Sequence, residues 1–89
     1  MEKLIIGQRA LSPDAASVTP LDDHILRVRF VNGELRDFDM KPLLPRKCYS
    51  ALASEALFRT ARVEYGVVIW ANGADLDPEW LYTDSVPAR

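Results

Sequence analysis

Cysteine, histidine and glycine are scarce in this chain of 89 residues, and each shortage excludes a class of site. The single cysteine, Cys48, rules out an internal disulfide framework and a metal cluster held by several thiolates. The single histidine, His24, has no nucleophile-elbow motif beside it, so we interpret it as an exposed turn residue and not as part of a catalytic triad. The four glycines stand singly, which excludes a glycine-rich loop that cradles phosphate.

Long apolar runs and a large excess of charge are also missing. No stretch approaches the roughly 20 apolar residues that a membrane-spanning helix needs, and no signal-peptide cleavage site follows the short apolar block at residues 4–6. A cytoplasmic protein without a membrane partner is therefore expected. The net charge of −2 argues against a dedicated nucleic-acid binder. With 48% hydrophobic and 27% charged residues, the chain has the composition of an ordinary globular domain.

The chain is long enough for one domain only, which we place at residues 15–86, followed by a tail at residues 87–89. Residues 1–14 are predicted to form a loosely attached arm. Two interpretations of the arm stay open: a frayed terminus, or a strand or helical turn laid on a partner subunit. The core of so short a domain is small, so pairing with a second copy is an easy way to bury more surface.

Three strands are expected before the first helical segment. The first covers residues 16–21, and Pro20 confines it to an edge of the sheet or to its own end. The second covers residues 24–31, where apolar and charged side chains alternate as in a half-buried strand. An Asn-Gly pair at residues 32–33 predicts a hairpin turn into the third strand, residues 34–40.

The sequence does not decide how the two strands of this hairpin pair. A two-residue loop would give Phe38 the wrong parity to share a face with Leu26, because side chains alternate with period two. An odd-length loop, or a β-bulge near residues 36–37, would return Phe38 to the apolar face. Either would also gather charges of opposite sign on the other face, where cross-strand ion pairs can form; these are Arg27, Arg29, Asp37 and Asp39.

A helical segment, two more strands and a short helix are expected after the hairpin. From residue 46 onward the pattern is helical, with an apolar stripe made of Leu44, Cys48, Ala51 and Leu52. Strands are predicted at residues 62–65 and 67–71, the second of them interior because its apolar run is nearly continuous. Asp77 is the expected N-cap of the last helix, with Pro78 in its first position. This order predicts an α+β domain with a mostly antiparallel meander sheet.

Three segments resemble a known bacterial family, the Domain of Unknown Function 2442: FxNGE with FD after it at residues 30–39, PLL at 42–44, and VxWxNGADLDPEWLY at 68–82. The resemblance covers roughly residues 15–83. It implies an α+β fold similar to the N-terminal domain of a small protein whose second domain is a DNA-binding helix-turn-helix. No such second domain is expected here, so a DNA-binding role is not carried over. The family has no established catalytic residues, and some members are encoded beside small toxin-like proteins.

The segment at residues 75–82 is the most distinctive, because acidic and aromatic residues gather in it. Its carboxylates could hold a cation or act as an acid–base pair, but each also has a structural role as a turn, a cap or a dipole partner. Tryptophan and tyrosine are frequent interface anchors, and they are equally frequent in small cores. We name six candidates for a partner or ligand surface: Trp70, Asn72, Asp75, Asp77, Trp80 and Tyr82.

The expected function is that of a non-enzymatic protein-interaction module, whose partner is another protein or a second copy of the chain. An antitoxin-like or regulatory role is one version of it, implied by the family resemblance. The alternative is a small-ligand-binding or enzymatic domain centred on residues 75–82. No metal or cofactor is expected, and direct nucleic-acid binding is the least favoured function.

Overall fold

The computed structural model of this chain describes residues 12–88. The arm predicted over residues 1–14 therefore lies outside the described residues, apart from residues 12–14. Within the described part, no helix is long and apolar enough to cross a membrane.

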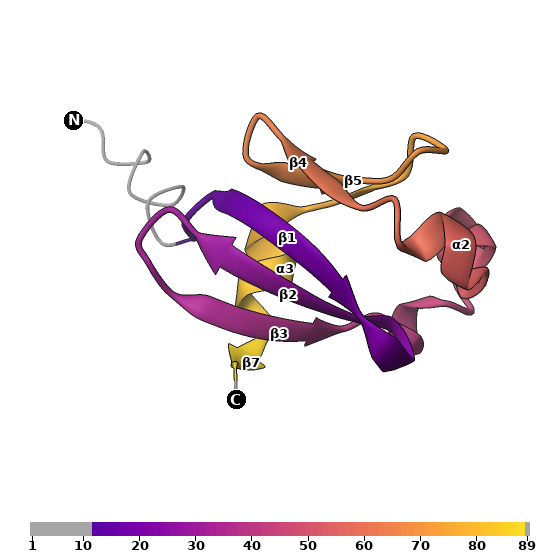
Figure 1. Cartoon of the computed structure of the whole chain (residues 1–89), viewed down its shortest axis with the longest axis horizontal. Coiled ribbons are helices and arrows are strands. Elements are labelled where there is room, and N and C mark those ends of the chain that lie inside the picture. Colours follow the sequence, from indigo (N-terminus) through magenta and orange to yellow (C-terminus); the bar gives the residue numbers. More distant parts are fainter. Residues whose placement is uncertain (1–11, 89) are drawn as a thin grey trace.

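Two antiparallel sheets and several short helices make up the described chain, which confirms the α+β class (Figure 1). The larger sheet has the order β1–β2–β3–β7, with strands at Ala15–Leu21, Ile25–Phe30, Leu35–Asp39 and Val86–Pro87. The smaller sheet has the order β4–β5–β6, with strands at Arg62–Glu64, Val67–Ile69 and Asp75–Leu76. The α-helices are α2 (Glu55–Phe58) and α3 (Pro78–Thr83). The 3-10 helices are η1 (Asp22–His24), η2 (Lys41–Leu43) and η3 (Lys47–Ala53).

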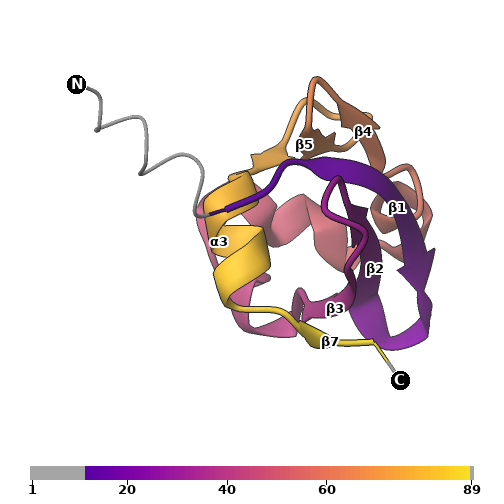
Figure 2. The same ribbon diagram turned by 90° about the vertical axis from the view of Figure 1, so that its left-hand side faces the viewer.

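One core lies behind the larger sheet. Figure 1 shows β1, β2 and β3 side by side with α3 behind them, and the turned view of Figure 2 confirms that α3 lies on one side of this sheet. Side chains from both sheets and from the helical segments fill the core; the most deeply buried are Leu26, Val28, Phe30, Met40, Leu52, Phe58, Val68, Trp70, Leu76 and Leu81. The molecule thus has one side of the larger sheet in the core and the other facing outward.

The β2–β3 hairpin has a three-residue loop, which confirms the odd-length alternative. Phe30 N–H donates to the carbonyl of Glu34 (2.9 Å), so residues 31–33 form the loop. Phe38 consequently stands opposite Leu26 and is buried. Gly33 closes the loop with φ = +94°, a conformation that glycine adopts without steric cost.

One cross-strand ion pair forms on the outer face of the hairpin. Arg27 stands opposite Asp37, and their side chains make two hydrogen bonds of 2.9 and 3.0 Å. Arg29 stands opposite Leu35, and Asp39 pairs with Lys41 at 3.0 Å. The expected pairing of opposite charges is therefore confirmed for Arg27 only.

The apolar stripe predicted from Leu44 to Leu52 assumed the wrong helical period. Residues 47–53 form a 3-10 helix, which has about three residues per turn, so the buried side chains are Tyr49 and Leu52. Cys48 and Ala51, expected on the buried stripe, are exposed. The prediction used the 3.6-residue period of an α-helix, which selects different residues.

His24 is not the exposed turn residue that the sequence suggested. It is half-buried: its Nε2 donates to the carbonyl of Leu52 (2.9 Å), and its ring lies 4.7 Å from that of Phe58. The side chain therefore connects the end of η1 to the helical segment. The backbone of His24 has a positive φ of 58°. Its role is structural, and it joins parts of the chain that are far apart in the sequence.

Candidate functional site

Helix α3 begins where the sequence predicted. The carboxylate of Asp77 accepts a hydrogen bond from Glu79 N–H (2.9 Å), and Pro78 occupies the first helical position, where no backbone donor is lost. The prediction that Asp77 is the N-cap is thus confirmed. Immediately before it, Asp75 belongs to the two-residue strand β6 and stands opposite Ile69 of β5, whereas the sequence suggested a turn.

The turn at Asn72 repeats the chemistry of the β2–β3 loop. Trp70 N–H donates to the carbonyl of Ala74 (2.9 Å), and the side-chain oxygen of Asn72 accepts from Ala74 N–H (3.1 Å). Gly73 has φ = +91°. Asn72 is exposed, but its side chain already holds the turn, which is sufficient reason for its presence.

The three candidate aromatic residues differ in exposure. Trp70 is 1% exposed and donates from Nε1 to the carbonyl of Phe58 (3.1 Å), so its side chain belongs to the core. Trp80 is half-buried: its Nε1 donates to Asp84 (2.6 Å), and the guanidinium of Arg46 lies 5.0 Å from its ring centre. Both tryptophans therefore have intramolecular partners for their polar atoms.

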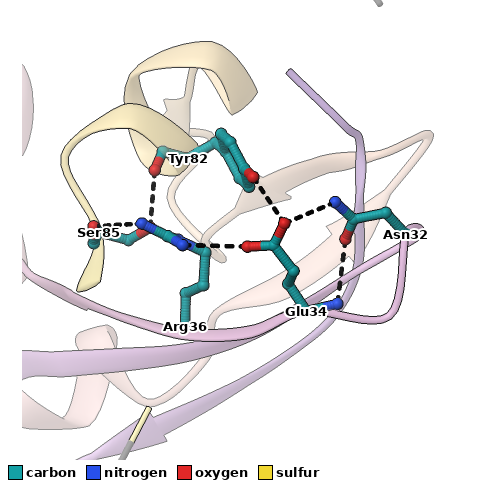
Figure 3. Close-up of polar contacts among 5 residues, drawn as sticks. All are labelled: Asn32, Glu34, Arg36, Tyr82 and Ser85. Atoms are coloured by element: carbon teal, nitrogen blue, oxygen red, sulfur yellow. Dashed lines mark hydrogen bonds and ion pairs between the residues drawn. The ribbon is translucent and has the colours of Figure 1, made fainter. Parts of the chain in front are cut away.

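Tyr82 belongs to a polar cluster that we call the Glu34 network, made of Asn32, Glu34, Arg36, Tyr82 and Ser85 (Figure 3). One carboxylate oxygen of Glu34 accepts from the Tyr82 hydroxyl (2.7 Å) and from Asn32 (2.9 Å), and the other accepts from Arg36 (3.0 Å). These bonds, that of Tyr82 first, hold the pKa of Glu34 below its usual value. The same bond to Glu34 raises the pKa of Tyr82.

Within this network, Arg36 connects Glu34 to Ser85, which lies between α3 and β7. Its Nε donates to the hydroxyl of Ser85 (2.7 Å), and its Nη2 donates to the Ser85 carbonyl (2.8 Å). Its guanidinium also lies 4.9 Å from the ring centre of Tyr82. The Glu34 network therefore fastens α3 and β7 to β3.

The Glu34 network was not predicted, although one signal in the sequence pointed to it. Glu34 and Arg36 share a face with Phe38 because side chains alternate with period two, and the odd-length loop makes this the core face. Charged side chains on a core face need partners, because burying an unpaired charge is costly. The parity indicated that Glu34 and Arg36 have partners, but not which ones. Tyr82 lies 48 residues after Glu34, and Ser85 lies 49 residues after Arg36.

The remaining candidates, Asp75 and Asp77, line a cavity of about 500 Å³ that we call the acidic hollow. Three parts of the chain form it: its lining consists of Ser12 and Asp14, of Val67, and of Asp75, Asp77, Pro78 and Glu79. Four of these residues carry carboxylates and none is basic. Among the residues that the structure describes, no group of three or more histidine, cysteine or acidic side chains is placed to hold a metal ion.

Hydrogen bonds hold two of the residues that line the acidic hollow, Asp75 and Asp77. The backbone of Asp75 is fixed by the β5–β6 pairing and by the Tyr49 hydroxyl, which donates to the Asp75 carbonyl (2.9 Å). The carboxylate of Asp77 is oriented by its capping bond to Glu79 N–H. Val67 and Pro78 add apolar surface. The hollow thus combines fixed negative charge with an apolar wall.

A family model matches nearly the whole described chain and shows which family the protein belongs to. Residues 15–87 match the model of a family described as "Protein of unknown function (DUF2442)". The chain belongs to the DUF2442 family. This confirms the resemblance, and the Glu34 network and all of the acidic hollow except Ser12 and Asp14 lie inside the matched range. Comparisons with curated proteins and with solved structures find no match.

Proposed function

We propose that this DUF2442 protein is a protein-interaction module that holds a basic segment of a partner protein in the acidic hollow. One observation supports it above the others: Asp14, Asp75, Asp77 and Glu79 line one cavity, and none of its lining residues within 12–88 is basic. A cation that enters a cavity lined by carboxylates is attracted to them, because opposite charges attract.

The apolar wall favours an amino-acid side chain as the cation. Lysine and arginine carry their charge on a stem of methylene groups, which packs on apolar surface while the charged head stays among polar groups. In the acidic hollow such a stem would lie on Val67 and Pro78, with the head among the carboxylates. Nucleic acid and anionic lipid both present negative charge, which the hollow would repel.

The proposal is tested by removing charge from the hollow without changing its shape. In the double variant Asp75→Asn/Asp77→Asn, asparagine keeps the N-cap of α3 because it caps as well as aspartate. We expect its affinity for a fluorescein-labelled arginine–glycine repeat peptide, measured by anisotropy at low salt, to fall about 3- to 10-fold, as for the loss of two partly exposed charge contacts.

The matched control is Asp23→Asn, which removes one negative charge at an exposed site in η1. Asp23 has φ = 64°, a conformation that asparagine also tolerates, so the control should fold normally. An equal loss of affinity in the control would mean that net charge, and not the acidic hollow, governs binding, and would contradict the proposal.

A small organic cation is the alternative ligand, since about 500 Å³ lies within the usual range of small-molecule sites. A thermal-shift titration with spermidine distinguishes it, because a ligand that binds the folded state raises the melting temperature with occupancy. A rise with spermidine but no binding of the peptide would favour the small-ligand function.

An antitoxin-like role is the narrower version of the proposal, in which the partner is the product of a neighbouring gene. Co-expression and co-purification of the two products test it. Repeated failure to isolate a complex would contradict this version and leave the basic segment of another protein as the partner.

A further inference from the structure

Tyr65 is exposed in a way that the fold does not explain. It lies at the tip of the hairpin between β4 and β5, is 100% exposed and has a backbone φ of 53°. Residues other than glycine rarely adopt positive φ, with asparagine among the commonest exceptions. With Gly66 at φ = 80°, this is the two-residue hairpin turn for which Asn-Gly is the preferred sequence.

A tyrosine in this position departs from the local preference twice. Its backbone conformation is less favourable than it would be for asparagine, and its ring contacts water on all sides. A residue that breaks a local rule without a structural gain is a candidate for a role in function.

The tip of this hairpin is fixed next to the acidic hollow. Ala15 N–H donates to the Gly66 carbonyl (3.1 Å), and a Cβ atom on Gly66 would lie 2.7 Å from Cγ of Asp14. Asp14 lines the hollow, and so does Val67, which follows Gly66 directly. The ring of Tyr65 is therefore carried by a turn whose Gly66 lies against Asp14 and whose next residue, Val67, lines the hollow.

We propose that Tyr65 is an aromatic anchor for the partner that enters the acidic hollow, and that this partner presents arginine. The inference rests on the proposed function for the basic character of the partner. Guanidinium is planar and weakly hydrated, so it stacks on an aromatic face while a second cation of the segment occupies the carboxylates. Lysine has no plane to stack and would gain less from the ring.

The test compares two labelled peptides of equal charge, an arginine–glycine repeat and a lysine–glycine repeat, on the wild type, Tyr65→Phe and Tyr65→Asn. We expect the wild type and Tyr65→Phe to prefer the arginine peptide by about 2- to 5-fold, the size of an exposed cation–π contact. Tyr65→Asn should lose this preference. Its melting temperature should rise by about 2–6 °C, because asparagine suits the turn better.

Opposite changes in binding and stability are the signature of this role. Unchanged affinity and preference in Tyr65→Asn would overturn the inference, as would a lower melting temperature, which would assign the ring a structural role. If Tyr65→Asn weakens binding while Asp75→Asn/Asp77→Asn does not, the role of Tyr65 stands and the acidic hollow is wrong. The reverse result would overturn the role of Tyr65 and leave the proposed function of the acidic hollow standing. If neither peptide binds the wild type, both proposals are wrong.

Discussion

Carboxylates occur at both ends of α3 in opposite settings. Near the end of the helix, Glu34 is surrounded by partners: a tyrosine hydroxyl, an amide and a guanidinium all donate to it. At the start of the helix, four carboxylates share the acidic hollow, and within residues 12–88 no ion pair joins them to a lysine or arginine. The Glu34 carboxylate is paired with a cation inside the fold, whereas in our proposal the carboxylates of the acidic hollow receive their cation from a partner.

The largest effect should come from breaking the Glu34 network at Arg36. Arg36→Met removes three hydrogen bonds and leaves the Glu34 carboxylate without its cation, so the free energy of unfolding should fall by about 2–3 kcal/mol. Urea denaturation measures it. Arg29→Met, on the exposed face of the same sheet, is the control and should change stability by less than about 0.5 kcal/mol. Equal losses in both variants would contradict a special role for the network.

The cap of α3 allows the charge and the hydrogen bond of Asp77 to be separated. Asp77→Ala removes the acceptor for Glu79 N–H and should cost about 1 kcal/mol in thermal or urea unfolding. Asp77→Asn keeps an acceptor and should be close to the wild type in stability. If both substitutions were equally destabilising, the negative charge would have a structural role, and the contrast between the two ends of α3 would weaken.

The pKa of Glu34 predicts a pH dependence that Tyr82→Phe should reduce. Because the folded pKa is lower than in the unfolded chain, the unfolded state binds the proton more readily, and stability is lost as pH falls from the usual glutamate range through the folded pKa. Urea unfolding at several pH values should therefore show the wild type and Tyr82→Phe converging in acid. A gap between them that stays constant down to the lowest pH would mean that the hydroxyl acts independently of the Glu34 charge.

The smallest effect on stability should come from the acidic hollow itself. Asp75→Asn/Asp77→Asn should leave the melting temperature unchanged or raise it slightly, because it removes two negative charges that no lysine or arginine within residues 12–88 pairs with. Differential scanning calorimetry at low salt measures the change. A clear fall in melting temperature would show that these carboxylates stabilise the fold, as Glu34 does.

The sequence predicted those features that depend on neighbouring residues. The cap at Asp77 follows from an acceptor placed before Pro78, and the parity of Phe38 reduces the hairpin to two alternatives, an odd-length loop or a β-bulge, of which the structure has the loop. The α+β class, the antiparallel pairing and the family were also accessible in this way. Each of these depends on residues that are close together in the chain.

The features that were missed depend on contacts between distant segments. Glu34 bonds to Tyr82, and His24 to Leu52, across long separations that no local pattern encodes. Strand β7 has only two residues and exists because β3 offers it an edge. The acidic hollow forms because the fold brings Asp14 beside residues 75–79, so Asp75 and Asp77 were identified from the sequence and Asp14 was not.

The most direct test of the account is a ¹⁵N-HSQC titration of the protein with the unlabelled arginine–glycine repeat peptide at low salt. We expect the largest chemical-shift changes at amides around the acidic hollow, at residues 14, 65–67 and 75–79, and only small changes at residues 32–36 and 82–85 of the Glu34 network. Shifts centred on the network, with none around the hollow, would contradict it.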